Sequence, residues 1–253
     1  MRYSPSRAGL TPIDRRRFLL LVGGAATALA LHSTAHASAA LVDPLTGAIP
    51  LAFPLTVGAF QTPIADNWHE AREGMRYPWG HHAGSLRAHD GVDIYPADQT
   101  QLPLIYAPFE GVISAVCLRA SNDADARINY RVSSATPPPW DYSAATDTAD
   151  GLPLYGNFVW ITSSEAQSAG YAVLYAHLQN EPLLAALRPG QRVDALTPVG
   201  VMGDTGNAAG TPQLHVELHY PAGASALCRD CTPRHAVTSF DPFASLRTAI
   251  ARG

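Results

Sequence analysis

Short segments of alternating apolar and polar residues fill the chain from about residue 85 onward, and glycine or proline separates them. Alternation with a period of two is typical of strands that bury one face. We expect strands at residues 106–116, 158–161, 171–178 and 214–220. Helical patterns are confined to one turn at 183–187 and a C-terminal helix at 244–251. The pattern therefore predicts a mostly β fold, an antiparallel β-sandwich or open barrel with few short helices.

Two longer segments lack this pattern. Residues 40–84 carry many prolines, glycines and aromatics with little periodicity, and we expect an extended lead-in that packs against a β domain at 85–253. Within that domain, residues 118–154 are polar and proline-rich and predict an insertion. Segments of this length without secondary structure are often functional or disordered. Trp140 and Tyr142 could line a substrate groove there, and a plain surface loop is the alternative.

The first 39 residues have the three parts of an export signal. Arg15, Arg16 and Arg17 precede an apolar stretch that ends at Leu31, and small-residue cleavage sites follow at 35–39. The arginines resemble a twin-arginine signal. The apolar stretch is shorter than the roughly 20 residues that span a bilayer. We expect residues 1–39 to be removed, so that the protein meets the membrane only during export and reaches the periplasm, cell wall or medium. An uncleaved anchor is the alternative.

The charge of the remaining chain argues against nucleic-acid binding. All 17 basic residues are arginines, and removal of residues 1–37 leaves 12 arginines against 20 acidic residues, a net charge of −8. The sequence has no basic stripe, so neither nucleic acid nor an anionic lipid surface is an expected partner.

Three cysteines give no four-thiolate zinc site, because only one CxxC pair is present, Cys228 with Cys231. For an exported protein the pair favours a small disulfide, and redox chemistry is the alternative. Cys117 lies in an apolar run and predicts a buried thiol.

Chemistry-bearing side chains gather in the segment 213–220. On a strand, Gln213, His215, Glu217 and His219 share one polar face, which must look at solvent or at a site. Backbone positions two apart are separated by about 6.6 Å. One side chain can therefore bind a metal while its neighbour reaches a ligand held on that metal.

His89 and Asp93 form a second candidate pair, four residues apart. On a straight strand they would be about 13 Å apart, too far to share one ion easily. Gly91, Val92 and the following residues argue against a helix. A shared metal therefore requires a bend between the two, and Gly91 is the residue that tolerates one.

His89, Asp93 and His215 together make a set of two histidines and one carboxylate. Catalytic zinc typically keeps three protein ligands and an open position for water, which then becomes a nucleophile near neutral pH. His177 could orient that water or move its proton. Tyr175, expected to face the same way as His177, is the candidate substrate contact.

Each of these pieces alone has a plainer interpretation. A histidine in a strand is commonly a surface residue or a hydrogen-bonded core group, and the HxxxD spacing arises often by chance. His69, His81 and His82 lie near the first motif. We expect that they do not bind the metal directly, and that they are either unrelated to the site or contact the ligands from outside it.

The order of the motifs is more specific than any one of them. The succession closely resembles the LytM/lysostaphin-type zinc endopeptidases over residues 85–220. It consists of His89-Asp-Gly-Val-Asp93, Tyr106-Ala-Pro108, Tyr155-Gly-Asn157, Tyr175-Ala-His-Leu178, Gly203-Asp-Thr-Gly-Asn207 and Gln213-Leu-His-Val-Glu217.

The resemblance implies a small antiparallel β fold of the lysostaphin type, with Zn²⁺ at His89, Asp93 and His215. It implies His177 as a catalytic histidine and peptidoglycan peptides as substrates. The family's last motif is normally HxH, and its first histidine helps to stabilise the tetrahedral intermediate. Gln213 stands at that position and can donate a neutral hydrogen bond but cannot carry a proton.

Three functions follow from these observations. The first is a zinc endopeptidase of the cell wall. The second, favoured by Gln213, is a weak or inactive relative that binds peptidoglycan or regulates another wall hydrolase. The third is a zinc enzyme with another substrate, such as a secreted protein.

Overall fold

The computed structural model describes residues 48–68, 71–72, 87–89, 91–118, 130–139, 155–224, 226–227 and 236–252. The chain divides into two compact units, residues 1–36 and 37–253, and all described residues lie in the second. The predicted export signal, residues 1–39, lies outside them. No helix within the described ranges combines the length and apolar character needed to cross a bilayer.

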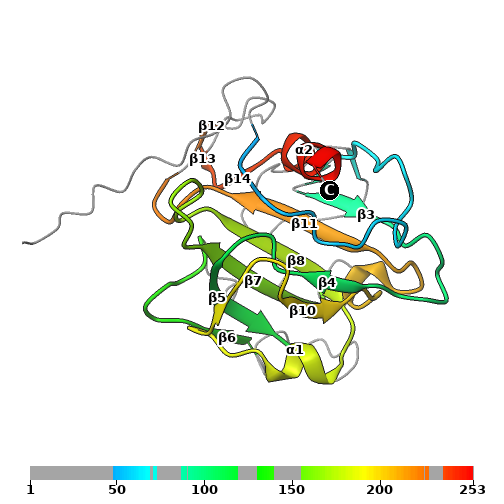
Figure 1. The fold of residues 1–253 in the computed structure, drawn as a ribbon, viewed down its shortest axis with the longest axis horizontal. Coiled ribbons are helices and arrows are strands. Elements are labelled where there is room, and N and C mark those ends of the chain that lie inside the picture. The colour runs from blue at the N-terminus through cyan, green and yellow to red at the C-terminus, as the bar shows by residue number, and fades with distance from the viewer. Residues whose placement is uncertain are drawn as a thin grey trace, which may run out of the picture. The chain divides into compact units, whose positions relative to one another are not determined.

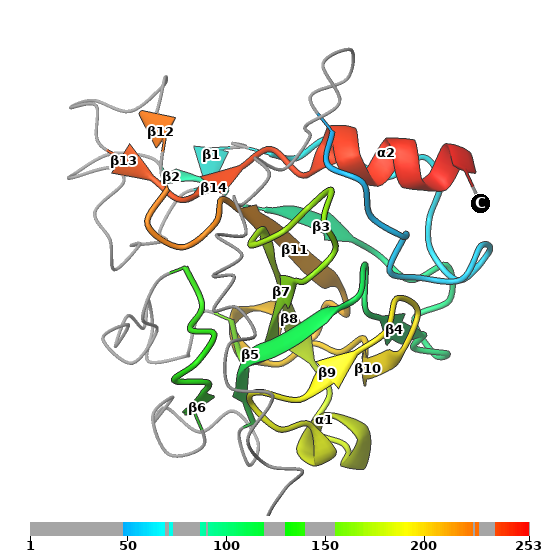
Figure 2. The same cartoon turned by 60° about the vertical axis from the view of Figure 1, so that its left-hand side comes forward.

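An antiparallel sheet of eight strands dominates the described residues (Figures 1 and 2). Its order is β14-β11-β8-β7-β5-β6, and in addition β3 pairs with β11 and β9 pairs with β5. In chain order the strands are β3 (Val92–Ile94), β5 (Gly111–Cys117), β6 (Tyr130–Val132), β7 (Asn157–Ser163), β8 (Ala172–Leu178), β9 (Arg192–Val193), β11 (Leu214–His219) and β14 (Ser239–Phe240). The predicted mostly β, antiparallel fold class is confirmed.

The remaining elements are short. Three two-stranded pairs consist of β1 (Ala71–Arg72) with β2 (Arg87–Ala88), β4 (Leu104–Tyr106) with β10 (Pro198–Val201), and β12 (Ala226–Leu227) with β13 (Ala236–Val237). The helices are α1 (Pro182–Ala186), the 3-10 helix η2 (Gly206–Ala208) and α2 (Phe243–Arg252). Both helical patterns read from the sequence therefore match a helix, within one residue at each end.

Both faces of the central strands are buried, but by different clusters. Val159, Val173 and Val216 point into the large aliphatic cluster. Phe158 and Trp160 point the other way, into a smaller cluster with alanines of β8. Burial on both faces explains why β7 is a continuous apolar run rather than an alternating one.

The polar face of β11 is buried as well. Gln213 is 7% exposed, His215 5%, Glu217 1% and His219 3%. The predicted alternation is present, and of its two readings the solvent-facing one is wrong. Buried polar groups require hydrogen-bond partners, so this face must form an internal network.

The lead-in supplies part of the core. Ile49, Leu55 and Phe60 belong to the large aliphatic cluster. The backbone N–H of Ile49 donates to Ser245 Oγ of α2 at 3.1 Å. In Figures 1 and 2 the blue lead-in runs beside α2 near β3. Residues 48–68 thus form part of the domain rather than a separate appendage.

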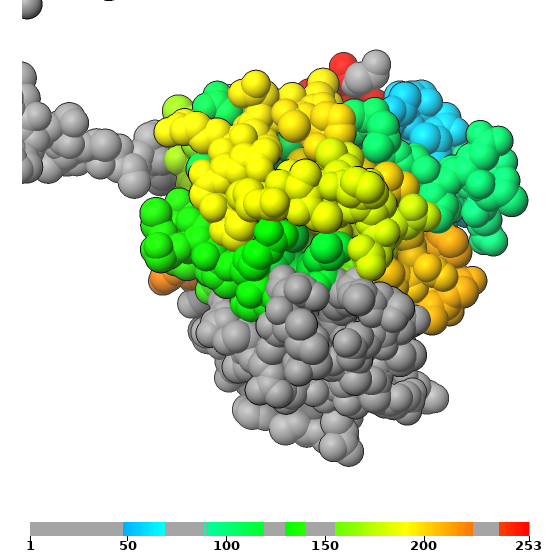
Figure 3. Space-filling model, turned by 90° about the horizontal axis from the view of Figure 1, so that it is seen from below, coloured from blue at the N-terminus to red at the C-terminus, as the bar shows by residue number. Residues whose placement is uncertain are grey.

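The predicted insertion at 118–154 is partly regular. β6 lies inside it and extends the sheet by pairing with β5, Ala115 opposite Val132. Trp140 and Tyr142 lie outside the described residues. Seen from below, the yellow segment of α1 and β9 lies against green residues of β5 and β6 (Figure 3).

Candidate metal centre

Three side chains from two distant segments of the sequence meet at one point. His89 Nε2 lies 3.0 Å from His215 Nδ1 and 3.2 Å from Asp93 Oδ1. His215 Nδ1 lies 2.9 Å from the same Asp93 oxygen. All three residues are buried, and their ligand atoms lie within 4.8 Å of one another. The convergence required by the sequence hypothesis is therefore present.

The pairing of β3 with β11 brings two of the three together. Asp93 lies directly opposite His215 in the antiparallel register. Opposite residues of an antiparallel pair project to the same face with their Cβ atoms about 5 Å apart. A carboxylate and an imidazole at such a pair can therefore share one ion.

The third ligand reaches the same point because the backbone bends. β2 ends at Ala88, β3 begins at Val92, and the chain bends at Gly91. A Cβ on Gly91 would lie 2.5 Å from the Val216 carbonyl oxygen and 2.6 Å from His215 Cε1. Glycine is required here for close approach to β11, in addition to the bend that the spacing predicted.

Asn67 makes hydrogen bonds to both candidate ligands of the first motif, His89 and Asp93. The backbone carbonyl oxygen of Asn67 can only accept, so His89 Nδ1 donates a hydrogen bond to it at 2.9 Å. A neutral His89 then has its lone pair on Nε2, the atom that faces the other ligands. The Asn67 side-chain oxygen accepts from the Asp93 backbone N–H at 3.1 Å. The lead-in thereby fixes the tautomer of one ligand and the backbone of another.

Asp93 is ionised in this setting. Burial opposes ionisation, but the interactions with the adjacent His215 and His89 side chains outweigh it and hold the pKa of Asp93 well below its usual value. An anionic oxygen between two imidazoles is a donor set suited to a divalent cation.

Glu217 fixes the orientation of His215. Its Oε1 lies 3.0 Å from His215 Nε2. Burial opposes ionisation of this carboxyl, but hydrogen bonds from His215 and His219 lower the pKa of Glu217 strongly. A carboxylate can only accept, so His215 carries a proton on Nε2 and turns Nδ1 toward Asp93 and His89. Metal ligands of this kind typically have such a partner behind them.

The donor set fits zinc. A tetrahedral ion with bonds of about 2.0–2.1 Å separates its ligand atoms by about 3.3 Å, and the three observed separations are 2.9–3.2 Å. Burial disfavours protonation of His215, but hydrogen bonds with Asp93 and Glu217 raise its pKa to about 9. A zinc ion held here would have to displace a proton from Nδ1, and such competition makes metal binding weaker at lower pH.

His177 lies beside this set in a left-handed conformation. Its ring centroid is 5.8 Å from that of His215, in an edge-on arrangement. Its φ angle is +62°, which is uncommon for residues other than glycine. Burial first, and the charge of His215 second, lower the pKa of His177 to about 4. The imidazole is therefore neutral near neutral pH.

Thr205 fixes the tautomer of His177. Its carbonyl accepts from His177 Nδ1 at 2.8 Å, which leaves the lone pair on Nε2. Thr205 is itself held, because its hydroxyl donates to the Leu178 carbonyl at 2.8 Å and accepts from the Asn157 N–H at 2.9 Å. Gly156 makes room for this contact, since a Cβ there would lie 2.4 Å from Thr205.

Tyr175 does not share the face of His177, contrary to the sequence prediction. The β7–β8 register shifts between Asn157 and Val159, and the left-handed residue at His177 lies in the matching stretch of β8. Tyr175 and Leu178 consequently both belong to the aliphatic core. Tyr175 is 1% exposed, so the structure gives a substrate no surface of this side chain to contact.

Gln213 directly precedes β11, the strand that carries His215. It pairs with Gly203, whose carbonyl accepts from the Gln213 N–H at 2.9 Å. A Cβ on Gly203 would lie 2.8 Å from the His177 carbonyl oxygen. The backbones of Gln213 and His177 therefore both lie beside Gly203.

Several candidate residues cannot be placed. His69, His81, His82, Cys228 and Cys231 lie outside the described residues. Cys117 is a buried thiol, as predicted. The roles of Asn67 and of the Thr205 carbonyl were not anticipated. Asn67 lies in a segment without periodicity, and Thr205 acts through its backbone, which no side-chain motif reveals.

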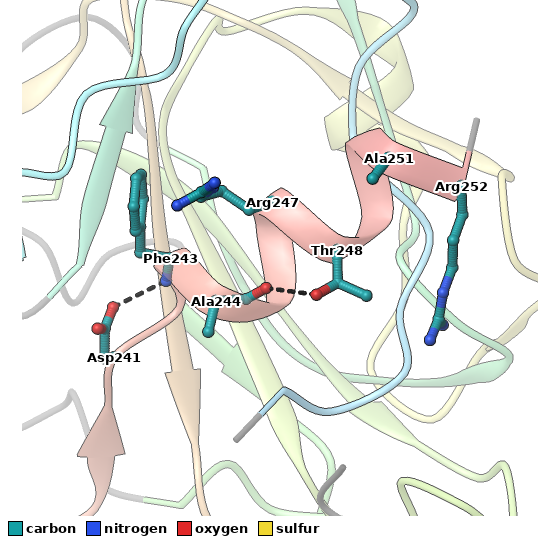
Figure 4. A pocket seen from close by; sticks show the side chains of 7 residues that line it. All are labelled: Asp241, Phe243, Ala244, Arg247, Thr248, Ala251 and Arg252. Atoms are coloured by element: carbon teal, nitrogen blue, oxygen red, sulfur yellow. Dashed lines mark hydrogen bonds between the residues drawn. The ribbon is translucent and has the colours of Figure 1, made fainter. Parts of the chain in front are cut away.

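A separate shallow pocket follows α2 and contains none of the predicted site residues (Figure 4). Within it, Asp241 accepts from the Phe243 N–H at 2.8 Å, and Thr248 donates to the Ala244 carbonyl at 2.9 Å. Its lining residues are Asp241, Phe243, Ala244, Arg247, Thr248, Ala251 and Arg252.

Comparison with known proteins supports the resemblance read from the motifs. The model of Peptidase family M23 matches residues 145–227, a third of the chain. The matched stretch includes His177, Gln213 and His215, whereas His89 and Asp93 lie before it. No curated protein sequence matches the chain.

Three similar solved structures are peptidases or M23 proteins by description. Lysostaphin, an antimicrobial peptidase from Staphylococcus simulans, is 14% identical, over 80% of this chain and 56% of that chain, with a TM-score of 0.45. A zinc-containing peptidase from Vibrio cholerae is 18% identical, over 68% and 37%, with a TM-score of 0.39. The catalytic domain of the prophage-encoded M23 protein EnpA from Enterococcus faecalis is 15% identical, over 75% and 94%, with a TM-score of 0.39. The chain thus spans less than two thirds of the first two proteins, and likeness at these TM-scores carries no conclusion about activity.

Proposed function

We propose that the protein is an exported zinc metallo-endopeptidase that hydrolyses peptide bonds of bacterial peptidoglycan. The observation that carries this proposal is the convergence of His89, Asp93 and His215, each with its ligand atom turned inward by a hydrogen bond or by strand pairing. The M23 family match supports a peptidase. The motif resemblance supplies the substrate class, and the N-terminal sequence supplies export.

A Zn²⁺ held by these three side chains would act as a Lewis acid toward a peptide carbonyl and would make water more acidic. His177 supplies the proton acceptor. Its Nδ1–H is engaged by Thr205, so Nε2 has the lone pair that receives a proton. A pKa of about 4 keeps His177 neutral when substrate arrives, and a transferred proton can pass from it to the leaving amine.

Gln213 supplies a neutral hydrogen-bond donor at the position where the family places a histidine. Its amide N–H groups can stabilise a developing oxyanion but cannot deliver a proton. Loss of one oxyanion donor typically lowers the rate by about 10²–10³, and replacement by another donor lowers it less. We therefore expect zinc-dependent activity below that of a protein with histidine at this position.

Gln213 also favours a second function, a non-catalytic relative that binds peptidoglycan or regulates another wall hydrolase. In that case the site residues would still hold the metal and shape a binding surface. The two functions differ in one measurable respect, because only the enzyme creates new amino and carboxyl ends in the wall peptides.

The test is digestion of purified sacculi by the purified protein, loaded with Zn²⁺ or treated with a chelator. Mass spectrometry identifies soluble peptides with new termini. We expect the wild-type protein to release peptides only when zinc is bound. His215→Ala should lose both the bound metal and the release of peptides, whereas His177→Asn should keep the metal and lose the release. Arg247→Ala, on α2 away from the site, is the control that should behave as wild type.

Absence of release, or release that persists after chelation, contradicts the enzyme proposal. The non-catalytic function predicts instead that the protein binds sacculi, that His177→Asn binds them equally, and that no new termini form in either case.

A further inference from the structure

A buried hydrogen-bond array continues from the candidate metal centre along β11. Glu217 lies at its middle, between His215 and His219 on the same face of the strand. Its Oε2 lies 2.6 Å from His219 Nε2, and its Oε1 accepts from both His215 Nε2 and the Tyr155 hydroxyl. One carboxylate thus accepts three hydrogen bonds, and only one of the donors belongs to a metal ligand.

His219, at the end of the array away from His89 and Asp93, is also held by a hydrogen bond and by packing. His219 Nδ1 lies 3.0 Å from Thr238 Oγ1, on the segment that leads into β14. The His219 ring packs edge-on against Trp160, with centroids 4.7 Å apart. His219 and Tyr155 are each 3% exposed. His219 is therefore held in place by contacts that do not involve the candidate metal ligands, whereas the ring of Tyr155 packs against both Phe158 and His215.

The neighbouring strand leaves room for this array. His215 lies opposite Ala176 on β8, and His219 lies opposite Ala172. Two alanines on the facing positions accommodate two imidazole rings between packed strands. The sequence pattern of β8 and β11 is therefore matched to a polar array inside the sheet, rather than to an isolated ligand.

Burying this array without a function is costly. An ionised carboxylate removed from water is unfavourable unless it is fully paired, and a well-packed apolar group in its place is often neutral or stabilising. His215 alone would satisfy only part of the capacity of Glu217. The two additional donors restrict the plane of the carboxylate, and that plane sets the direction of the His215 Nε2–H bond and hence of Nδ1.

We propose that His219 and Tyr155 are positioning residues for the metal site: by clamping Glu217, they aim His215 Nδ1 at the point shared with His89 and Asp93. The inference rests on the proposed function, because it assumes that this point holds a metal ion. It assigns a role to two residues, from β11 and from the turn before β7, that do not themselves reach the ion.

The experiment measures Zn²⁺ affinity of the full chain by competition with a chromophoric chelator, together with the absorption spectrum of the Co²⁺-loaded protein. Removal of a partner behind a metal ligand typically weakens affinity 10- to 100-fold. We expect about a 10-fold loss in Tyr155→Phe and in His219→Leu, with altered Co²⁺ bands. His219→Gln retains an N–H that can reach Glu217 and should recover most of the affinity.

Tyr171→Phe is the matched control, since it removes a hydroxyl from another buried tyrosine, which directly precedes β8 and packs in the aliphatic cluster. If His219→Leu fails to fold, Tyr155→Phe and His219→Gln still decide the question. The assignment would be overturned if Tyr155→Phe had the Zn²⁺ affinity and Co²⁺ spectrum of the wild type. It would also be overturned if His219→Gln lost as much Zn²⁺ affinity as a folded His219→Leu. A wild-type chain that binds no Zn²⁺ would refute the proposed function instead, so the two failures are distinguishable.

Discussion

Gly91 offers the sharpest test of how the metal site is assembled. In Gly91→Ala the added Cβ would lie 2.5 Å from the carbonyl oxygen of Val216, 2.6 Å from His215 Cε1 and 2.7 Å from His215 Nε2. The first contact is with backbone in a paired strand, which cannot turn aside as a side chain can. The second and third are with a metal ligand, so the substitution strikes the site directly.

The size of the effect follows from these distances. Cβ atoms essentially never approach other atoms within 3.0 Å, so the backbone at Gly91 and β11 must separate by at least 0.5 Å, and the His215 ring must shift or tilt as well where that separation does not clear it. Overpacking of this kind costs about 1–3 kcal/mol of folding free energy. Ligand groups tolerate displacements of only about 0.5 Å, and a tilted ring also loses its bond to Glu217. We therefore expect Zn²⁺ affinity to fall at least 10- to 100-fold.

Two other glycines separate a defect in the site from a general defect in the sheet. In Gly111→Ala the Cβ would lie 2.4 Å from the Thr162 carbonyl oxygen, away from the ligands. This variant should lose stability but keep its zinc affinity. In Gly200→Ala the nearest atom is the end of the Leu178 side chain at 3.2 Å, which can move, so both properties should change little.

The assays are urea unfolding of the chelator-treated protein and zinc competition titration of the folded protein. Wild-type zinc affinity in Gly91→Ala would refute the claim that close approach at this glycine sets the ligand geometry. So would an equal loss of affinity in Gly111→Ala.

Three further predictions concern single residues. Gln213→His should raise the zinc-dependent release of wall peptides by about 10- to 100-fold; an unchanged rate would show that Gln213 does not limit activity. Asn67→Ala leaves the buried N–H of Asp93 without its acceptor and should cost about 1–3 kcal/mol in urea unfolding together with weaker zinc binding, whereas Asn67→Asp, which keeps an acceptor oxygen, should lose less. The pKa of His177 is about 4 in the folded protein against 6.5 ordinarily. The unfolded chain therefore binds a proton more readily than the folded one, and the free energy of unfolding of the metal-free protein should fall by about 3 kcal/mol at most as the pH falls from 6.5 toward 4. His177→Asn, which also tolerates the left-handed backbone, should show a smaller loss over that range, and identical pH profiles would contradict the lowered pKa.

The sequence was sufficient to predict the four central strands, β5, β7, β8 and β11, because their apolar pattern matches the buried sheet, although the strand predicted at 106–116 divides into the end of β4 and β5. The short strands β3, β6, β9 and β14 were not predicted. Leu214, Val216 and Leu218 alternate with polar residues, and β11 is formed there. The ligands were also predictable, since Asp93 and His215 belong to motifs of recognisable order. The metal hypothesis required a bend near Gly91, and the structure has that bend.

The contacts that Asn67 makes with His89 and Asp93, and Thr205 with His177, were not predictable, because they depend on backbone atoms and on residues distant in sequence. The Asn67 and Thr205 carbonyls act independently of side-chain identity. The buried state of the polar face of β11 is equally invisible to periodicity, which separates two faces but does not say that another layer covers the polar one.

His177 shows where strand alternation fails as a guide to a functional site. A regular β8 would send Tyr175 and His177 to the same face, the aliphatic core, and His177 could not reach His215. The left-handed backbone at His177 shifts the alternation by one residue, so that Tyr175 and Leu178 stay in the core while His177 turns toward the ligands. Such a conformation costs about 1 kcal/mol or more for a residue with a side chain. The hydrogen bonds that His177 donates to the carbonyls of Thr205 and Tyr155 hold this conformation in place. Backbone strain maintained in this way at one histidine is the physical reason that this candidate functional residue departs from the pattern that predicted its neighbours.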